Sequence, residues 1–155
     1  MGNARHQIDL DAEHALFEGR ISGLVVACYE DERPLQGLAG LLDWRFQGAF
    51  SRCLLSGALT GKAGECVYMP LTRPNVGPDG PTGNERTYHL ILAGAGKLDA
   101  GGKRGPLPQE TLDAVHKNLS SLKLSEMGIS TSDLGNAAET FLLKTVKGIS
   151  LWIVH

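Results

Sequence analysis

The stretch GLVVACYE (Gly23–Glu30) decides the fold class of this chain. Apolar and β-branched residues follow one another in it, without the alternation that marks a strand with one face in water. A run of this length and composition is typical of a strand that is buried on both faces of a sheet. We therefore expect helices to cover both faces of the sheet that contains it.

The residues that follow change to a helical period. In GLAGLLDWRFQGAFSRCLLSG (Gly37–Gly57), apolar residues recur at three- and four-residue spacing and mark one side of a helix. They are Leu38, Leu41, Leu42, Phe46, Ala49, Phe50 and Cys53. Gly40 and Gly48 indicate either a break into two shorter helices or close packing against a neighbour. Gly57 and Gly61 then end the helical region.

Two further strands are predicted at GECVYMPL (Gly64–Leu71) and RTYHLILAGAG (Arg86–Gly96). The intervening TRPNVGPDGPTGNE (Thr72–Glu85) is rich in proline and glycine and has no apolar anchor, which predicts a mobile loop. Because no helix separates these two strands, they can pair antiparallel.

The last third of the chain alternates helix and strand. PLPQETLDAVHKNLSSL (Pro106–Leu122) predicts a helix that begins at Pro108, and EMGIST (Glu126–Thr131) predicts a short strand. NAAETFLLKTVKG (Asn136–Gly148) predicts a second helix with Asn136 as its N-cap. ISLWIVH (Ile149–His155) predicts a final strand.

A weaker alternation in RHQIDLD (Arg5–Asp11) adds a strand at the beginning of the chain. Strands that alternate with helices, with one connection free of helix, predict an α/β fold: a three-layer α/β/α sandwich on a mixed sheet. We expect residues 1–155 to form a single domain, because 155 residues bury one sizeable core.

Composition limits the molecules that this protein could bind and the compartment in which it could reside. A net charge of −2 gives no electrostatic footprint for nucleic acid, and Lys97, Lys103 and Arg104 are interpreted as a solvated glycine-rich loop. Three separated cysteines predict reduced thiols. The N-terminal segment has no apolar stretch typical of a signal peptide, and no run is long enough to span a membrane. We expect a cytoplasmic protein.

The pattern of ionisable residues predicts no reactive centre. The five histidines are dispersed, and neither a metal-ligand spacing nor a nucleophile motif occurs. Glu30–Glu32 is interpreted as a solvated strand end. We expect no catalytic residues, no metal and no cofactor.

Gly94, Gly96 and Lys97 raise the question of a phosphate-binding loop. A P-loop carries Ser or Thr after the lysine, whereas Leu98 stands here. A dinucleotide-binding loop leads directly into a helix, whereas about ten residues precede Pro108. The pattern favours a tight exit from the sheet.

The segments GLVVACYEDERPLQGLAGLLDWRFQGAFSRCLLSGALTGKAGE (Gly23–Glu65) and YHLILAGAGK (Tyr88–Lys97) resemble the N-terminal domain of the leucyl aminopeptidase (cytosol aminopeptidase) family. The resemblance extends from Gly23 to His155 and implies a macro-domain-like fold. In that family the two metal ions and the catalytic lysine and arginine belong to a C-terminal domain with an NTDAEGR-type motif, which is absent from this sequence. The resemblance thus implies the companion domain without the peptidase site.

A macro-type fold also implies a nucleotide ligand such as ADP-ribose, held by a loop after an early strand and a glycine-bearing loop before a late helix. The corresponding segments are YEDERPLQG (Tyr29–Gly37) and TSDLGN (Thr131–Asn136). The first is acidic and would repel a diphosphate. The candidate ligand residues are Gly94, Gly96, Lys97, Ser132, Asp133, Gly135 and Asn136.

Three functions follow from these observations. The leading hypothesis is a non-catalytic protein-interaction, regulatory or assembly module that associates with itself or with a full-length aminopeptidase, with Trp44 as a candidate contact. The second is a macro-type domain that binds ADP-ribose or a related nucleotide. The third is a fragment of a dizinc leucyl aminopeptidase whose peptidase domain is absent.

Overall fold

A computed structural model describes residues 6–155, and within them six strands form one mixed sheet in the order β1-β6-β5-β2-β4-β3. The strands are β1 (His6–Gln7), β2 (Gly23–Cys28), β3 (Cys66–Gly77), β4 (Gly80–Gly94), β5 (Glu126–Ser130) and β6 (Ser150–Val154). All neighbours in the sheet are parallel except β3 and β4, which are antiparallel. The predicted mixed sheet and its antiparallel pair are confirmed.

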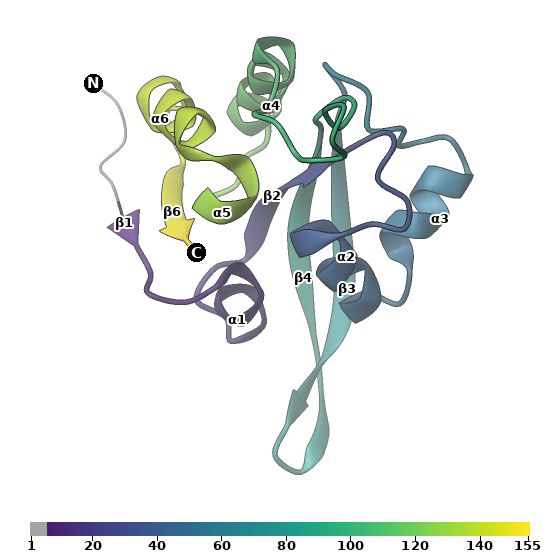
Figure 1. Cartoon of the computed structure of the whole chain (residues 1–155). Helices are drawn as coiled ribbons and strands as arrows, with labels where there is room; N and C mark the ends of the chain where they lie inside the picture. The colour runs from purple at the N-terminus through teal and green to yellow at the C-terminus, as the bar shows by residue number, and fades with distance from the viewer. Residues whose placement is uncertain (1–5) are drawn as a thin grey trace.

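Helices cover both faces of the sheet (Figure 1). The helices are α1 (Ala12–Phe17), α2 (Gly37–Arg45), α3 (Ala49–Leu55), α4 (Gln109–Ser121), α5 (Thr131–Leu134) and α6 (Asn136–Thr145). Buried residues of α1, α2 and α3 belong to one hydrophobic cluster, and those of α4, α5 and α6 belong to the other. The predicted three-layer α/β/α sandwich is therefore confirmed.

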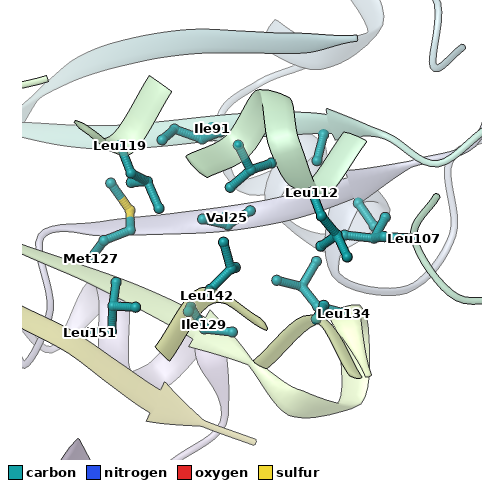
Figure 2. Packing of buried hydrophobic residues seen from close by; sticks show 14 of the residues in the cluster. Val25, Ile91, Leu107, Leu112, Leu119, Met127, Ile129, Leu134, Leu142 and Leu151 are labelled. Carbon is teal, nitrogen blue, oxygen red and sulfur yellow. The ribbon is translucent and has the colours of Figure 1, made fainter. Parts of the chain in front are cut away.

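Strand β2 lies between the two clusters, and all six of its residues are buried. Successive side chains of a strand point to opposite faces, so β2 contributes to both clusters. Val25 and Ala27 join the cluster beneath α4 and α6, whereas Val26 and Cys28 join the cluster beneath α1–α3. Figure 2 shows Val25 within the first cluster, among side chains of the neighbouring strands and of the helices that cover them.

The helical stretch from Gly37 to Gly57 breaks in two at Gly48, one of the two alternatives that its glycines indicated. Gly48 has a φ of +80°, in the left-handed region that glycine adopts at little cost, and it separates α2 from α3. Gly40 is an example of the other alternative, close packing against a neighbour, because a Cβ there would overlap the carbonyl oxygen of Leu35.

The segment Thr72–Glu85 forms a β-hairpin, and the prediction of a loop was wrong. Cross-strand pairs continue from Thr72 and Thr87 to Gly77 and Gly80, with a bulge after Pro74, so that β3 and β4 extend beyond the rest of the sheet (Figure 1). Pro74 fits because β3 is an edge strand, where a missing N–H need not break a ladder. Antiparallel pairing to β4 outweighed the poor strand propensity of proline and glycine.

Helix α1 was not predicted, because six residues are too few to establish a helical period. The carboxylate of Asp11 caps this helix by accepting a hydrogen bond of 2.8 Å from the N–H of His14. The preceding strand is confirmed, although β1 contains only two of the seven residues of the segment from Arg5 to Asp11. Arg5 and the four residues before it lie outside the described residues.

Within residues 6–155, no helix combines the length and the apolar character needed to cross a bilayer. Cys28 is buried and Cys53 and Cys66 are partly buried, and all three are free thiols, as predicted.

Packing at the end of β4 predicts the effect of a single methyl group. A Cβ added to Gly94 would overlap the carbonyl oxygen of Lys62, and backbone atoms cannot move aside as a flexible side chain does. We expect Gly94→Ala to lower the free energy of unfolding by about 3 kcal/mol, measured by urea denaturation. Gly105→Ala is the control, because a Cβ there meets no atom within 4 Å. Equal stability of the two variants would contradict this account.

Candidate functional site

A crevice opens at the carboxyl ends of β2 and β5, which are parallel neighbours in the sheet. The chain leaves β2 toward α2 on one face and leaves β5 toward α5 and α6 on the other. Where the chain departs to opposite faces of a parallel sheet, a ligand crevice forms outside the strand ends. The cavity here has a volume of about 340 Å³. Its lining residues are Tyr29, Arg104, Gly105, Pro106, Ser132, Asp133, Leu134, Gly135, Asn136 and Ala137.

The guanidinium of Arg104 lies at the centre of the polar contacts of this crevice. Its Nε and one terminal nitrogen donate to the two carboxylate oxygens of Glu32, at 2.9 and 2.7 Å. The other terminal nitrogen donates to Asp133 Oδ1 at 2.8 Å, and a further bond of 3.0 Å reaches the carbonyl oxygen of Gln36. The side chain of Arg104 is 26% exposed, against 8% for Glu32 and 2% for Asp133. These are therefore ion pairs largely removed from water.

Arg104 holds the pKa of Glu32 below its usual value, first through their hydrogen bonds and against the opposite effect of burial.

The ion pair of Arg104 and Glu32 shows that two interpretations of the sequence were wrong. Glu32 is not a solvated strand end, and Arg104 is not part of a solvated loop. The reason is that the two residues, 72 positions apart, satisfy each other in the folded chain, which no local pattern reveals.

Asp133 connects the crevice to the central strand. Its Oδ2 accepts a hydrogen bond of 2.9 Å from the backbone N–H of Ala27 in β2. Burial raises the pKa of Asp133, and the Ala27 N–H and Arg104 act against that rise. The carboxylate thus ties α5, β2 and Arg104 together.

Tyr29 forms one wall of the crevice, directly after β2. Its ring lies under Arg104, whose guanidinium carbon is 5.1 Å from the ring centre, within the range of a cation–π contact. Its hydroxyl donates a hydrogen bond of 2.5 Å to the carbonyl oxygen of Gly105, and burial raises the pKa of that hydroxyl. These contacts fix the segment around Arg104 and Gly105 over the strand end.

The junction of α5 and α6 forms the opposite wall. Ser130 caps α5 through its hydroxyl oxygen, and Gly135, with a φ of +89°, turns the chain into α6. Asn136 is the first residue of α6 rather than its N-cap, so the predicted capping role was wrong. Gly135 takes that position, and Glu139 accepts a hydrogen bond from the hydroxyl of Thr131. The first N–H groups of a helix have no intrahelical partners, and no side chain caps those of α6, which lie beside the crevice.

The structure brings together four of the seven candidate ligand residues. Ser132, Asp133, Gly135 and Asn136 all line the crevice. Gly94, Gly96 and Lys97 do not line it and lie at the end of β4, on the far side of β2.

At the end of β4 the glycine N–H groups are already bonded. Gly94 N donates to Glu65 O at 2.7 Å and Gly96 N donates to Gly61 O at 2.8 Å. The side chain of Lys97 is 76% exposed and lies 3.9 Å from a carboxylate oxygen of Glu30. This geometry is that of a strand exit, as the sequence favoured.

A metal ion could be held elsewhere by Asp11, Glu13 and His14, whose ligand atoms lie within 4.8 Å of one another. All three groups already have partners that explain them. Asp11 caps α1 and pairs with His14, and Glu13 pairs with Arg45 at 2.5 Å. The arrangement has a structural explanation without an ion.

Comparison of the sequence with protein-family models gives no match, and comparison with curated proteins gives none either. Solved structures are similar in fold. The macrodomain of Thermus aquaticus DarG matches with a TM-score of 0.62 and 13% identity over 99% of both chains. The macrodomain of Mycobacterium tuberculosis DarG matches with a TM-score of 0.53 and 16% identity, over 99% of this chain and 98% of that one.

A mutant of tomato leucine aminopeptidase matches with a TM-score of 0.58 and 14% identity over 100% of this chain. This chain covers 33% of the length of the tomato enzyme. At such identities the likeness shows the fold alone. The chain has a macrodomain-like fold, as the resemblance implied, and membership of the aminopeptidase family stays a prediction.

The ion pair of Arg104 and Glu32 predicts a pH-dependent stability. Because the folded-state pKa of Glu32 lies below its ordinary value of 4.5, its contribution is present above pH 4.5 and is lost as the pH falls through the folded value. We expect Glu32→Gln to lower the free energy of unfolding by about 2 kcal/mol at pH 7. The difference from the native chain should shrink in acid, measured by urea denaturation across pH. A difference that stays constant down to pH 2 would contradict this prediction.

Proposed function

We propose that this chain is a macro-type module that binds a nucleoside diphosphate of the ADP-ribose class in the crevice between β2 and α6. The observation that carries the proposal is the uncapped start of α6, which borders a cavity at the carboxyl ends of two parallel strands. Free N–H groups and the positive end of the helix dipole favour an anion at this position. The macrodomain-like fold supports the same class of ligand.

The acidic loop after β2 does not oppose this function as strongly as its sequence indicated. Glu32 and Asp133 both bind the guanidinium of Arg104, and Glu30 lies near Lys97. One guanidinium thus offsets part of the charge of the two carboxylates, and Lys97 lies near the charge of Glu30. A ligand phosphate at the start of α6 would meet helix N–H groups, with the paired carboxylates to one side of it.

The volume and walls of the crevice indicate which ligand would fit it. A volume of about 340 Å³ is near the lower end of the range for small-molecule sites, and it suits the diphosphate with one attached ring. Tyr29 is held by its hydroxyl and by Arg104, which gives the site a pre-formed aromatic wall. We infer binding without turnover, because the carboxylates of the crevice are engaged in ion pairs.

A second candidate function is self-association through α2 and α3. Trp44 and Leu55 are 75% and 88% exposed, and Leu41, on α2 with Trp44, is also exposed. A groove of about 830 Å³ runs past Trp44 and Leu55, with Leu35 and Leu54 in its lining. Exposed apolar residues that gather in one place mark interaction sites.

Nucleotide binding is tested with ADP-ribose by isothermal titration calorimetry. We expect saturable binding to the native chain and loss of at least about tenfold in affinity in Asn136→Asp, because a new carboxylate at the start of α6 would repel the diphosphate. The substitution should not unfold the chain, since an acidic residue in the first turn favours a helix.

The matched control for that experiment is Asn84→Asp, which adds the same charge on the exposed hairpin. It should bind ADP-ribose like the native chain. Absence of any binding heat with the native chain, or equal loss in both variants, would refute the proposed site.

Self-association is tested by sedimentation equilibrium of the native chain and of Trp44→Ser. We expect the native chain to dimerise and the variant to remain monomeric, because removing a large exposed apolar side chain removes the centre of the contact. Leu143→Ser, on α6 across the sheet, is the control and should dimerise. A native chain that is monomeric at every concentration would overturn this second candidate.

A further inference from the structure

A second cavity, of about 550 Å³, lies at the other end of the sheet, beside the base of the β3–β4 hairpin. The register of β2 and β4 places it there, since Gly23 pairs with His89 and the earlier residues of β4 precede the start of β2. Its lining includes the arginines Arg45, Arg73 and Arg86 and the aromatic residues Phe17, Phe46 and Tyr88. The cavity shares none of its lining with the crevice at Arg104.

The three rings pack against one another. Their centres are 5.4 Å apart for Phe17 and Phe46, 5.3 Å for Phe17 and Tyr88, and 5.4 Å for Phe46 and Tyr88. Phe46 and Tyr88 are buried, whereas Phe17 is partly exposed. They form a rigid aromatic floor at the edge of the cluster beneath α1–α3.

One arginine guanidinium lies over each of the three rings. The guanidinium carbon of Arg45 is 3.9 Å from the centre of Phe17, that of Arg86 is 4.8 Å from Tyr88, and that of Arg73 is 5.7 Å from Phe46. Stacking on a ring restrains a long side chain, so less entropy is lost when the guanidinium binds a ligand.

The positive charge of this group exceeds what the fold neutralises. Arg45 pairs with Glu13. Arg73 donates only to a neutral amide, Oε1 of Gln47 at 3.3 Å. Among residues 6–155, neither Arg73 nor Arg86 has a carboxylate within ion-pair distance, so the cavity carries a surplus of two positive charges.

A structural role explains Arg86 but not Arg73. Arg86 donates to the carbonyl oxygens of Leu16 and Ile21, at 3.0 Å each, and so holds the chain at the end of α1. Arg73 makes no such bond. The φ of +55° at its partner Gln47 is explained by the end of α2, because Gln47 follows the C-cap Phe46, where a left-handed residue commonly ends a helix.

We propose that this cavity binds a phosphate monoester through Arg73 and Arg86. A phosphate monoester is a dianion at neutral pH and matches the two unneutralised charges, and its three terminal oxygens suit the planar donor array of arginine. The volume of the cavity leaves room for the organic group of the ester beside the exposed part of Phe17. This site is separate from the proposed nucleotide crevice and does not depend on it.

The test is a titration of the full chain with phenyl phosphate, followed by the backbone amide resonances of Arg73 and Arg86. We expect saturable shifts at these positions and a dissociation constant about tenfold higher in Arg73→Gln. Lys117→Gln is the control, because it removes the same charge from an exposed position on α4, across the sheet. It should bind phenyl phosphate like the native chain.

Two further measurements separate this site from unspecific attraction. Affinity should fall as the pH decreases through about 6, where a monoester loses its second charge. Dimethyl phosphate, a diester with one charge, should bind more weakly than phenyl phosphate. No shift at Arg73, equal weakening in the Lys117 variant, or equal binding of the diester would overturn the proposal, whatever the outcome with ADP-ribose.

Discussion

The ion pairs of Arg104 with Glu32 and Asp133 are the constraint on which the candidate site depends. One guanidinium holds three segments that are distant in sequence: the loop after β2, the loop after β4, and α5. Removing charges from water is costly, and only good geometry repays the cost. The bidentate contact to Glu32 and the additional bond of Asp133 to β2 supply that geometry. Without Arg104, two carboxylates would lie buried side by side.

The same contacts give the crevice its chemical character. The side chains of Glu32 and Asp133 are bonded to Arg104, whereas no side chain caps the start of α6, which is where we propose that an anion binds. The cavity beside the hairpin works differently, since its arginines rest on aromatic rings and two of them lack carboxylate partners. One basic side chain thus completes the fold, whereas others leave charge available for a ligand. The difference between these arginines lies in the groups that they contact, since the residue type is the same.

Much of the fold could be predicted from the sequence, because strands and helices of ordinary length carry their own periodicity. The apolar run from Gly23 identified a doubly buried strand, and Gly40 and Gly48 indicated a broken helix or close packing, of which Gly48 marks the break and Gly40 the close packing. The hairpin at Thr72–Glu85 was missed because its two arms stabilise each other by cross-strand pairing, which the low strand propensity of proline and glycine does not reveal. Four of the seven candidate ligand residues line the crevice, since they lie in one short segment after β5.

The sequence by itself determined the layers and the burial of β2 on both faces, and it singled out residues of the segment from Thr131 to Asn136 that line the crevice. Only the tertiary structure decided which charges are neutralised: Arg104 with Glu32 and Asp133, and Arg73 with none in the described chain. The physical reason is the separation in sequence of the residues that interact. Hydrophobic periodicity is a pattern among residues that are close in sequence, whereas an ion pair joins residues whose distance in space is set by the fold.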